Sequence, residues 1–340
     1  MSLRAVLFLE FQHNNTNCLE EYQNCGACHN AGNSRITNCL PSRLDSHTVF
    51  IYIFKGFFLE YHEMKKYFSF VKIEHTLFTL PLIYGGLLLG IREMPSLRLL
   101  VLVLLAAVGA RTAAFALNRI IDREIDRRNP RTSGRELPSG RMTLGEALAV
   151  LVLGSVLYFG CGGMISTFCL MLSPIPLIIF VVYPFMKRFT VLAHFGVGLG
   201  MSMAPLGGWF AASPSFENLM PAVLLCIFTV LWGAGFDIIY ATLDEEFDKR
   251  EHLYSFVSRF GKDKALTYSA VLHVIGFACL VLLFFTTIRT WYAMPFLLLT
   301  GLLLWFEQRT AANVQLAFFR INAGLGFVVF AMIMTGAVVR

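Results

Sequence analysis

Residues 97–118 decide the fold, with the sequence LRLLVLVLLAAVGARTAAFALN, in which Arg98 and Arg111 are the only charged side chains. A membrane-spanning helix needs roughly 20 mostly apolar residues, and this run supplies them. Similar runs lie at residues 70–90, 143–162, 165–186, 189–211, 219–240, 265–287, 291–307 and 314–338. Because these runs are continuous and do not alternate between polar and apolar residues, they indicate helices. We expect one all-α polytopic membrane protein with nine transmembrane helices.

The composition agrees with this fold class. Of the 340 residues, 56% are hydrophobic and only 15% are charged, whereas a typical soluble domain is about 25% charged. So little charge cannot cover the surface of a water-soluble enzyme, and so apolar a chain would not stay disordered. The composition therefore excludes soluble globular proteins and disordered proteins.

The net charge of +6 reflects how basic residues are distributed over the predicted loops. Basic residues gather in the loops after the even-numbered spans, above all at Arg119, Arg123, Arg127, Arg128, Arg131, Arg135, Arg141, Lys187, Arg188, Lys249, Arg250, Arg259, Lys262 and Lys264. The opposite side carries only Arg92, Arg98, Arg289 and Arg340. Since basic loops stay in the cytoplasm, the even-numbered loops are predicted to face it.

Residues 1–63 differ from the rest of the chain, because they are polar, rich in Asn and hold half of the cysteines, Cys18, Cys25, Cys28 and Cys39. The string Cys25-Gly-Ala-Cys28-His29 has the spacing of a haem attachment site, and with Cys18 or Cys39 it would instead suit zinc. Met64, followed by two lysines, leads directly into the first span as a natural start would. We expect residues 1–63 to be a poorly structured N-terminal extension that need not be translated natively, and residues 64–340 to form the membrane domain.

Two acidic clusters lie where the second and sixth spans end. The first is Asn118-Arg-Ile-Ile-Asp122-Arg-Glu-Ile-Asp126, and the second is Asp237-Ile-Ile-Tyr240-Ala-Thr-Leu-Asp244-Glu-Glu-Phe-Asp248. If each span continues as a helix, Asn118, Asp122 and Asp126 lie within about 80° of one another. In the second cluster, Asp237, Asp244 and Asp248 lie within about 40°. Because both spans are even-numbered, the two stripes are predicted to lie on one side of the membrane and to face each other.

Facing carboxylates repel one another unless positive charge lies between them. Mg²⁺ takes oxygen ligands, usually one or two carboxylates, and fills its shell with water and substrate phosphate. Two such stripes would hold a diphosphate between two helices, and the nearby Arg and Lys side chains would bind the remaining phosphate oxygens. The alternative is a solvated acidic surface paired with neighbouring arginines.

Two further residues share these faces. Arg111 lies inside its span, seven residues before Asn118, and a charge at that depth is costly and usually functional. The alternative for Arg111 is a structural ion pair with an acid of the sixth span. Tyr240 shares the face of Asp237, where its hydroxyl would bond a substrate or a ligand carboxylate; the alternative is an interfacial aromatic.

From residue 64 onward the chain resembles the UbiA superfamily of intramembrane prenyltransferases. The two acidic clusters resemble the family's two Asp-rich motifs, the first of which is usually Asn-Asp-x-x-Asp-x-x-x-Asp; Arg119 stands where that motif has its first Asp and leaves one fewer carboxylate. Two other strings resemble the 4-hydroxybenzoate polyprenyltransferase branch, namely Arg131-Thr-Ser-Gly-Arg135-Glu-Leu-Pro138-Ser-Gly140 and Tyr183-Pro-Phe-Met-Lys187-Arg188.

The resemblance implies nine helices around a central cavity, capped on the cytoplasmic side of the inner membrane by the loops after helices 2 and 6. It implies Mg²⁺-dependent transfer of a polyprenyl chain from polyprenyl diphosphate to an aromatic hydroxy acid in quinone biosynthesis, with no nucleic acid or obligate protein partner. The expected catalytic metal ligands are Asp122, Asp126, Asp244 and Asp248. The expected substrate-binding residues are Asn118, Arg111, Arg135, Lys187, Arg188, Asp237 and Tyr240.

Alternatives within the family and from two other protein classes are considered at this point. The acceptor would be 4-hydroxybenzoate in ubiquinone synthesis or a hydroxynaphthoate in menaquinone synthesis, and other UbiA-type prenyltransferases also fit. A cation-coupled transporter uses intramembrane carboxylates as well, but near the midplane on broken helices. A phosphatidyl-alcohol transferase is disfavoured, because the sequence has no Asp-Gly-x-x-Ala-Arg string.

Overall fold

The computed structural model describes residues 66–72, 76–91, 94–314 and 320–338. The chain divides into two compact units, Met1–Tyr67 and Phe68–Arg340, and everything below concerns the second. The expected extension, residues 1–63 with its four cysteines, lies outside the described residues. Its lack of structure and its possible metal or haem chemistry therefore stay predictions.

Within the described residues the second unit is helical and has no β-strand. Its helices are α3 (Thr76–Gly90), α4 (Leu97–Ile121), α5 (Arg123–Arg128), α6 (Leu144–Ile165), α7 (Thr167–Leu172), α8 (Pro174–Met186), α9 (Ala193–Ala212), α10 (Met220–Ala241), η3 (Thr242–Asp244), α11 (Glu245–Arg250), α12 (Phe256–Phe260), α13 (Lys262–Leu283), η4 (Phe284–Ile288), η5 (Trp291–Ala293), α14 (Met294–Arg309) and α15 (Asn322–Val338).

Five helical segments of the described chain are long and apolar enough to cross a membrane, at Leu97–Ile121, Leu144–Ile165, Thr167–Met186, Met220–Arg250 and Lys262–Ile288. Shorter apolar helices occupy Thr79–Gly90 and Asn322–Ala337. The predicted all-α membrane fold is thus confirmed, while the number of nine spans stays a prediction.

The predicted span 165–186 is interrupted, because Pro174 begins a new helix directly after Ser173. Proline has no N–H, so it cannot donate the helical hydrogen bond to the carbonyl four residues earlier. That carbonyl belongs to Leu170, and the Ser173 hydroxyl donates to it at 2.6 Å instead. The side chain thereby replaces the missing backbone bond, which is needed where no water reaches the backbone.

Helix ends are fixed by local side chains. The Ser96 hydroxyl accepts a hydrogen bond from the Leu99 N–H at the start of α4. At the start of α6, Thr143 and Glu146 form a capping box in which each side chain bonds the other residue's backbone N–H. Such caps satisfy the N–H groups that a helix start leaves without partners.

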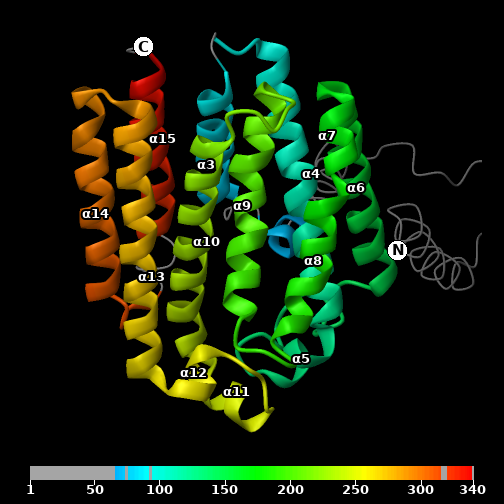
Figure 1. Ribbon diagram of the computed structural model, residues 1–340. Helices are drawn as coiled ribbons and strands as arrows, with labels where there is room; N and C mark the ends of the chain where they lie inside the picture. The colour runs from blue at the N-terminus through cyan, green and yellow to red at the C-terminus, as the bar shows by residue number, and fades with distance from the viewer. Residues whose placement is uncertain (1–65, 73–75, 92–93, 315–319, 339–340) are drawn as a thin grey trace, which may run out of the picture. The chain divides into compact units, whose positions relative to one another are not determined.

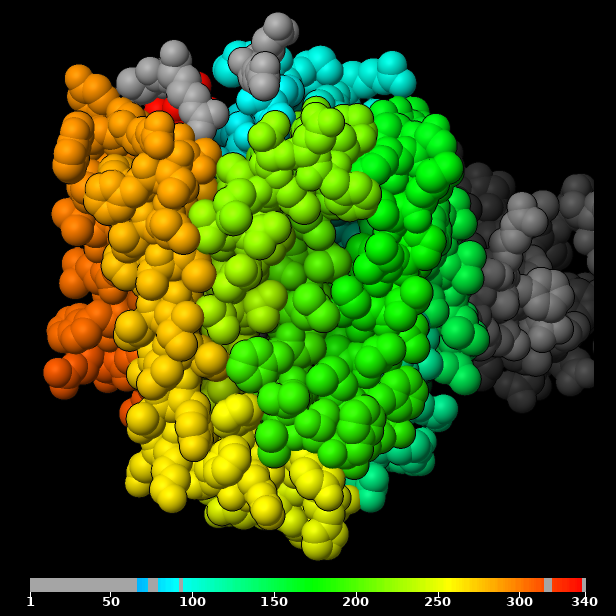
Figure 2. All heavy atoms as spheres, viewed as in Figure 1, coloured from blue at the N-terminus to red at the C-terminus, as the bar shows by residue number. Residues whose placement is uncertain are grey.

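The helices pack side by side in a bundle (Figure 1), with α9 between α3 and α10, α4 against α6, and α13 on the far side of α10. The crossing of α3 and α9 is very close, since a Cβ on Gly208 would overlap the carbonyl of Ile83 and one on Gly86 would overlap that of Pro205. Small residues allow such approach between membrane helices. Figure 2 shows side chains filling the spaces between α10 and α13 on one face, with α11 and α12 (yellow) at one end.

A buried polar network holds α10 to the C-terminal helices. The Trp232 indole N–H donates to the Asn322 side-chain oxygen at 2.7 Å, and the Asn322 amide donates to Glu307 at 2.9 Å. Trp232 also stacks on Phe228, with ring centroids 5.7 Å apart. Since polar groups inside a membrane need partners, these bonds fix the helix that carries the second acidic cluster.

Candidate active site

Each acidic cluster lies at a junction between two helices. Helix α4 ends at Ile121 and α5 begins at Arg123, with Asp122 between them at φ −89°, ψ 1°. In the second cluster Asp244, with φ −112°, ψ 11°, is the last residue of η3, and α11 begins directly after it. These dihedrals fall near the sparsely populated bridge region, where many active-site residues are found. The chain therefore remains helical on both sides of each residue, with an irregular step at Asp122 and at Asp244.

Both of these residues are held by side chains from distant parts of the chain. The Asp122 carboxylate is 2.7 Å from the Lys187 ammonium at the end of α8. The Asp244 carboxylate pairs with Arg131, which precedes it by more than a hundred residues. Residue spacing along one helix contains no information about these ion pairs.

The carboxylates of the first cluster are deeply buried. Asp122 is 3% exposed and Asp126 is 5% exposed. Asp122 accepts a hydrogen bond from the Asn118 amide at 3.1 Å, as expected for residues on one helical face. Both oxygens of Asp126 lie 2.7–2.8 Å from the Arg135 guanidinium. Burial raises the pKa of Asp122 above its usual value, although the positive charge of Lys187 opposes the rise.

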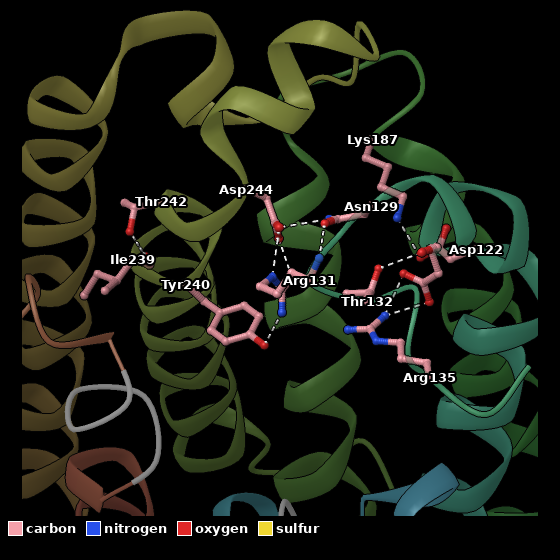
Figure 3. A network of polar contacts seen from close by, with 11 residues as sticks. Asp122, Asn129, Arg131, Thr132, Arg135, Lys187, Ile239, Tyr240, Thr242 and Asp244 are labelled. Carbon is pink, nitrogen blue, oxygen red and sulfur yellow. Dashed lines mark hydrogen bonds and ion pairs between the residues drawn. The ribbon is translucent and has the colours of Figure 1, made fainter. Parts of the chain in front are cut away.

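The second cluster is held by the loop that follows the first. The Asn129 amide and the Arg131 Nε donate to Asp244 at 2.9 Å and 2.8 Å. A second Arg131 nitrogen donates to the Tyr240 hydroxyl at 2.7 Å, and the guanidinium carbon lies 4.9 Å from the centre of the tyrosine ring. Figure 3 shows Arg131 reaching both Tyr240 and Asp244, and Lys187 pointing at Asp122. Burial by itself would lower the pKa of Arg131, but Asp244 and Tyr240 raise it above its usual value.

The two clusters therefore meet at one end of the bundle, where α5, α11 and α12 lie (Figure 1). An ion pair between Arg128 of α5 and Glu251 after α11 joins the same two regions. We call residues 129–142, between α5 and α6, the connecting loop. This loop supplies partners to both clusters, since Arg135 holds Asp126 while Asn129 and Arg131 hold Asp244.

A polar cavity of about 220 Å³ lies between the clusters. It is lined by most of the residues that the sequence singled out, namely Asn118, Asp122, Asp126, Arg135, Lys187, Asp237, Tyr240, Asp244 and Asp248. Arg188 does not line it: its guanidinium donates to the Ile121 carbonyl at 2.9 Å and lies over the Phe185 ring. Arg188 thus contacts the end of α4 instead of the cavity.

A larger and mostly apolar cavity of about 510 Å³ adjoins the polar one. Arg111 lines this larger cavity, with its guanidinium over the Phe115 ring at 4.8 Å. Tyr183, Val197 and Asp237 line both cavities, so the two spaces meet at these side chains. A charged compartment and an apolar compartment are therefore neighbours that share these side chains.

Some residues of the site were not predicted as site residues from the sequence, among them Asn129, Arg131 and His194. Arg131 had two signals, since it begins the string that resembles the hydroxybenzoate branch and belongs to the basic residues near the first cluster. His194 in the first turn of α9 places Nδ1 2.7 Å from the Asp237 carboxylate, and its signal was a polar side chain in an apolar run. Asn129 had no signal, because its role depends on a contact with a residue far away in sequence.

Magnesium prefers oxygen ligands, and the acidic clusters offer carboxylate and amide oxygens. The ligand atoms of the site therefore fit a magnesium ion. The buried Oδ1 of Asp122 has no hydrogen-bond partner within the part of the chain that the structure describes. No group of three or more His, Cys, Asp or Glu side chains among the described residues is arranged to hold a metal ion. Asp122, Asp126 and Asp244 are instead held by cationic side chains.

Comparison with known proteins gives the same family from sequence and from structure. The 4-hydroxybenzoate octaprenyltransferase of Vibrio cholerae serotype O1 is 32% identical over 202 residues, which cover 58% of this chain and 70% of that protein. The apo structure of a UbiA homolog from Aeropyrum pernix K1 is similar at a TM-score of 0.72 and 34% identity, over 77% of this chain and 98% of that one.

A UbiA homolog from Archaeoglobus fulgidus, solved bound to DMAPP and Mg²⁺, shares the fold at a TM-score of 0.62 and 22% identity, over 79% of this chain and 99% of that one. The model of the UbiA prenyltransferase family matches residues 79–335. That match spans both acidic clusters and both cavities, and it shows that this chain belongs to the UbiA prenyltransferase family and is a prenyltransferase enzyme.

Proposed function

We propose that this enzyme transfers a polyprenyl chain from polyprenyl diphosphate to a ring carbon of an aromatic hydroxy acid, 4-hydroxybenzoate or a similar acid, in quinone biosynthesis. One observation carries the proposal: a small cavity lined by acids and cations adjoins a larger apolar cavity. A polyprenyl diphosphate has the matching construction, with a charged head joined to an apolar tail. The name of the V. cholerae relative supports the acceptor class.

The diphosphate would bind in the polar cavity. Lys187, Arg131 and Arg135 line it and would bind phosphate oxygens through charge-assisted hydrogen bonds. Asp122, Asp126, Asp244 and Asp248 would hold Mg²⁺, which is present with DMAPP in the A. fulgidus homolog. Bound magnesium neutralises the charge that builds up on a departing diphosphate. The cations that hold three of these carboxylates would then shift to the phosphate oxygens.

The prenyl tail would occupy the apolar cavity, whose walls exclude water from the reacting carbon. When the bond between that carbon and the diphosphate oxygen breaks, an allylic cation forms. Tyr183 and Phe180 are among the aromatic side chains that line this cavity. Aromatic faces stabilise a cation by their quadrupole, and the absence of water prevents its hydrolysis.

The acceptor would lie where the cavities meet. Arg111 in the larger cavity would bind the acceptor's carboxylate, and Asp237 with Tyr240 would orient its hydroxyl. After the diphosphate has left, a ring carbon next to the hydroxyl attacks the allylic cation and forms the C–C bond. The ring then loses the proton from the attacked carbon and regains its aromaticity.

The basic loops support an integral protein of the inner, cytoplasmic membrane with the polar cavity on the cytoplasmic side. The test is to place single cysteines at Ser139 and at Lys262 after removal of the native cysteines. Both should react with an impermeant thiol reagent only from the cytoplasmic face. Reaction of the two positions from opposite faces would contradict this topology and the shared site.

The activity itself is tested with the full chain in lipid nanodiscs and a labelled polyprenyl diphosphate. The acceptors are 4-hydroxybenzoate, 1,4-dihydroxy-2-naphthoate and a phenol without a carboxyl group. We expect prenylation of an acid in the presence of Mg²⁺, loss of product on chelation and recovery when Mg²⁺ is added back. Prenylation of the naphthoate alone would make menaquinone synthesis the function. Ion-coupled uptake by the protein in sealed vesicles, without any prenylated acid, would favour a transporter and overturn the proposal.

A further inference from the structure

His194 connects three helices at the boundary of the two cavities. Its side chain lies in the first turn of α9 and is 4% exposed. Nδ1 is 2.7 Å from an oxygen of Asp237 on α10. On the other side of the ring, Nε2 accepts a hydrogen bond from the backbone N–H of Phe256, the first residue of α12, at 3.3 Å.

These two contacts determine which ring nitrogen carries the proton. A backbone N–H is only a donor, so Nε2 must be the unprotonated nitrogen that accepts. In a neutral imidazole the proton then resides on Nδ1, which donates to Asp237. The backbone of α12 thereby fixes both the tautomer and the orientation of the ring. The hydrogen itself is assigned from these partners.

The carboxylate that His194 holds, that of Asp237, lies where the two cavities adjoin. Asp237 lines both the polar and the apolar cavity, where the charged head of the donor, its reacting carbon and the acceptor would come together. A carboxylate with no fixed partner can occupy several rotamers. A hydrogen-bond donor on a packed, buried ring restricts the carboxylate to one rotamer. Groups that surround a metal site orient the metal's ligands in the same way.

The other buried histidine of the described chain provides a contrast. His273 on α13 is 3% exposed and lines neither cavity. Its Nδ1 lies 2.9 Å from the Gln308 amide, and the nearest Glu307 oxygen is 3.8 Å away, beyond hydrogen-bond distance. The contacts of His273 join helices away from the cavities. His194 instead contacts the backbone of α12 with one ring nitrogen and a carboxylate that lines both cavities with the other.

We propose that His194 is a positioning residue for prenyl transfer, which holds the Asp237 carboxylate so that it orients the acceptor hydroxyl. The inference rests on the proposed function. His194 itself need not touch substrate, so its removal should weaken the productive binding of the acceptor far more than that of the diphosphate.

Two substitutions separate the two contacts of the ring. In His194→Asn the amide occupies the place of Nδ1 and can still donate to Asp237, while the contact with Phe256 is lost. In His194→Gln the amide occupies the place of Nε2, so the contact with α12 remains and the donation to Asp237 is lost. We expect His194→Gln to raise the acceptor KM about 10- to 100-fold with the diphosphate KM unchanged. His194→Asn should stay within about threefold of the wild type, a change that corresponds to less than one kcal/mol.

The matched control is His252→Asn, an exposed histidine in the turn between α11 and α12, which should behave as wild type. In an Asp237→Asn background, His194→Gln should cause no further loss of kcat/KM for the acceptor, because its partner is already removed. Equal losses in the Asn and Gln variants, a wild-type Gln variant, or an additive loss in the double variant would each overturn the positioning role. Failure of the wild type to prenylate any aromatic acid would overturn the proposed function, and the positioning role with it.

Discussion

The two acidic clusters are alike in sequence but are stabilised in different ways. The carboxylates of Asp122 and Asp126 are buried, and one is paired with Lys187 from the end of α8. Asp244 is half-buried, and its bonds come from Asn129 and Arg131 of the connecting loop. The first cluster therefore has one partner from the bundle and one, Arg135, from the connecting loop, whereas both partners of Asp244 come from that loop.

This difference shows that the connecting loop is the shared part of the site. Through Arg135 it contacts the first cluster and through Arg131 the second. A chain with two similar motifs thus does not form two equivalent half-sites.

The largest effect is expected from the carboxylates themselves. Asp122→Asn and Asp244→Asn each remove a charged ligand while keeping the size of the side chain, and each should lower kcat by about 100-fold or more, as for loss of one electrostatic catalytic group. The measurement is prenyl transfer at saturating Mg²⁺ in nanodiscs. Glu246→Gln is the matched control, because Glu246 lies in the same segment as Asp244 but is exposed. Equal activities of Asp244→Asn and Glu246→Gln would show that the acidic stripe is not the site.

A smaller effect is expected from the connecting loop. Arg131→Gln and Arg135→Gln each remove charged hydrogen bonds worth about 1.5–3 kcal/mol, so kcat/KM should fall about 10- to 100-fold. If the loop serves each cluster through one arginine, the loss from Arg131→Gln should shrink in an Asp244→Asn background but persist in an Asp126→Asn background. The reverse pattern would mean that Arg131 does not act through Asp244, and that the loop does not serve each cluster through one arginine.

The smallest effect on chemistry is expected from the packing of the helices away from both clusters. Gly208→Ala places a methyl group against the Ile83 carbonyl where α9 crosses α3. Overpacking of this kind costs about 1–3 kcal/mol, so the thermal midpoint in detergent should fall while the residual activity keeps its acceptor preference. Gly207→Ala is the control, because a Cβ there has no described atom within 4 Å. The same midpoint for both variants would argue against the close crossing.

The fold class was predictable from the sequence because membrane helices are encoded locally. Continuous apolar runs such as 97–118 need no knowledge of distant contacts, and the structure has helix α4 there. The common face of Asn118 and Asp122 was likewise predictable, since it follows from helical spacing alone.

What could not be predicted depends on contacts between distant residues. The ion pairs of Asp122 with Lys187 and of Asp244 with Arg131 join residues that are far apart in the sequence. The pairing of His194 with Asp237 joins residues 43 positions apart, so it has no local pattern. The break at Ser173 is the exception, since Pro174 is a local signal that the length of the apolar run obscured.

The most direct test of the shared site is a double-mutant cycle of Asp122→Asn and Asp244→Asn in one prenyl-transfer assay at saturating Mg²⁺. If both clusters serve one diphosphate, the double variant should be about as active as the poorer single variant, because residues that act as a unit are strongly non-additive. Losses that multiply, as for independent sites, would mean that the clusters work separately and would contradict a single diphosphate site shared by the two clusters.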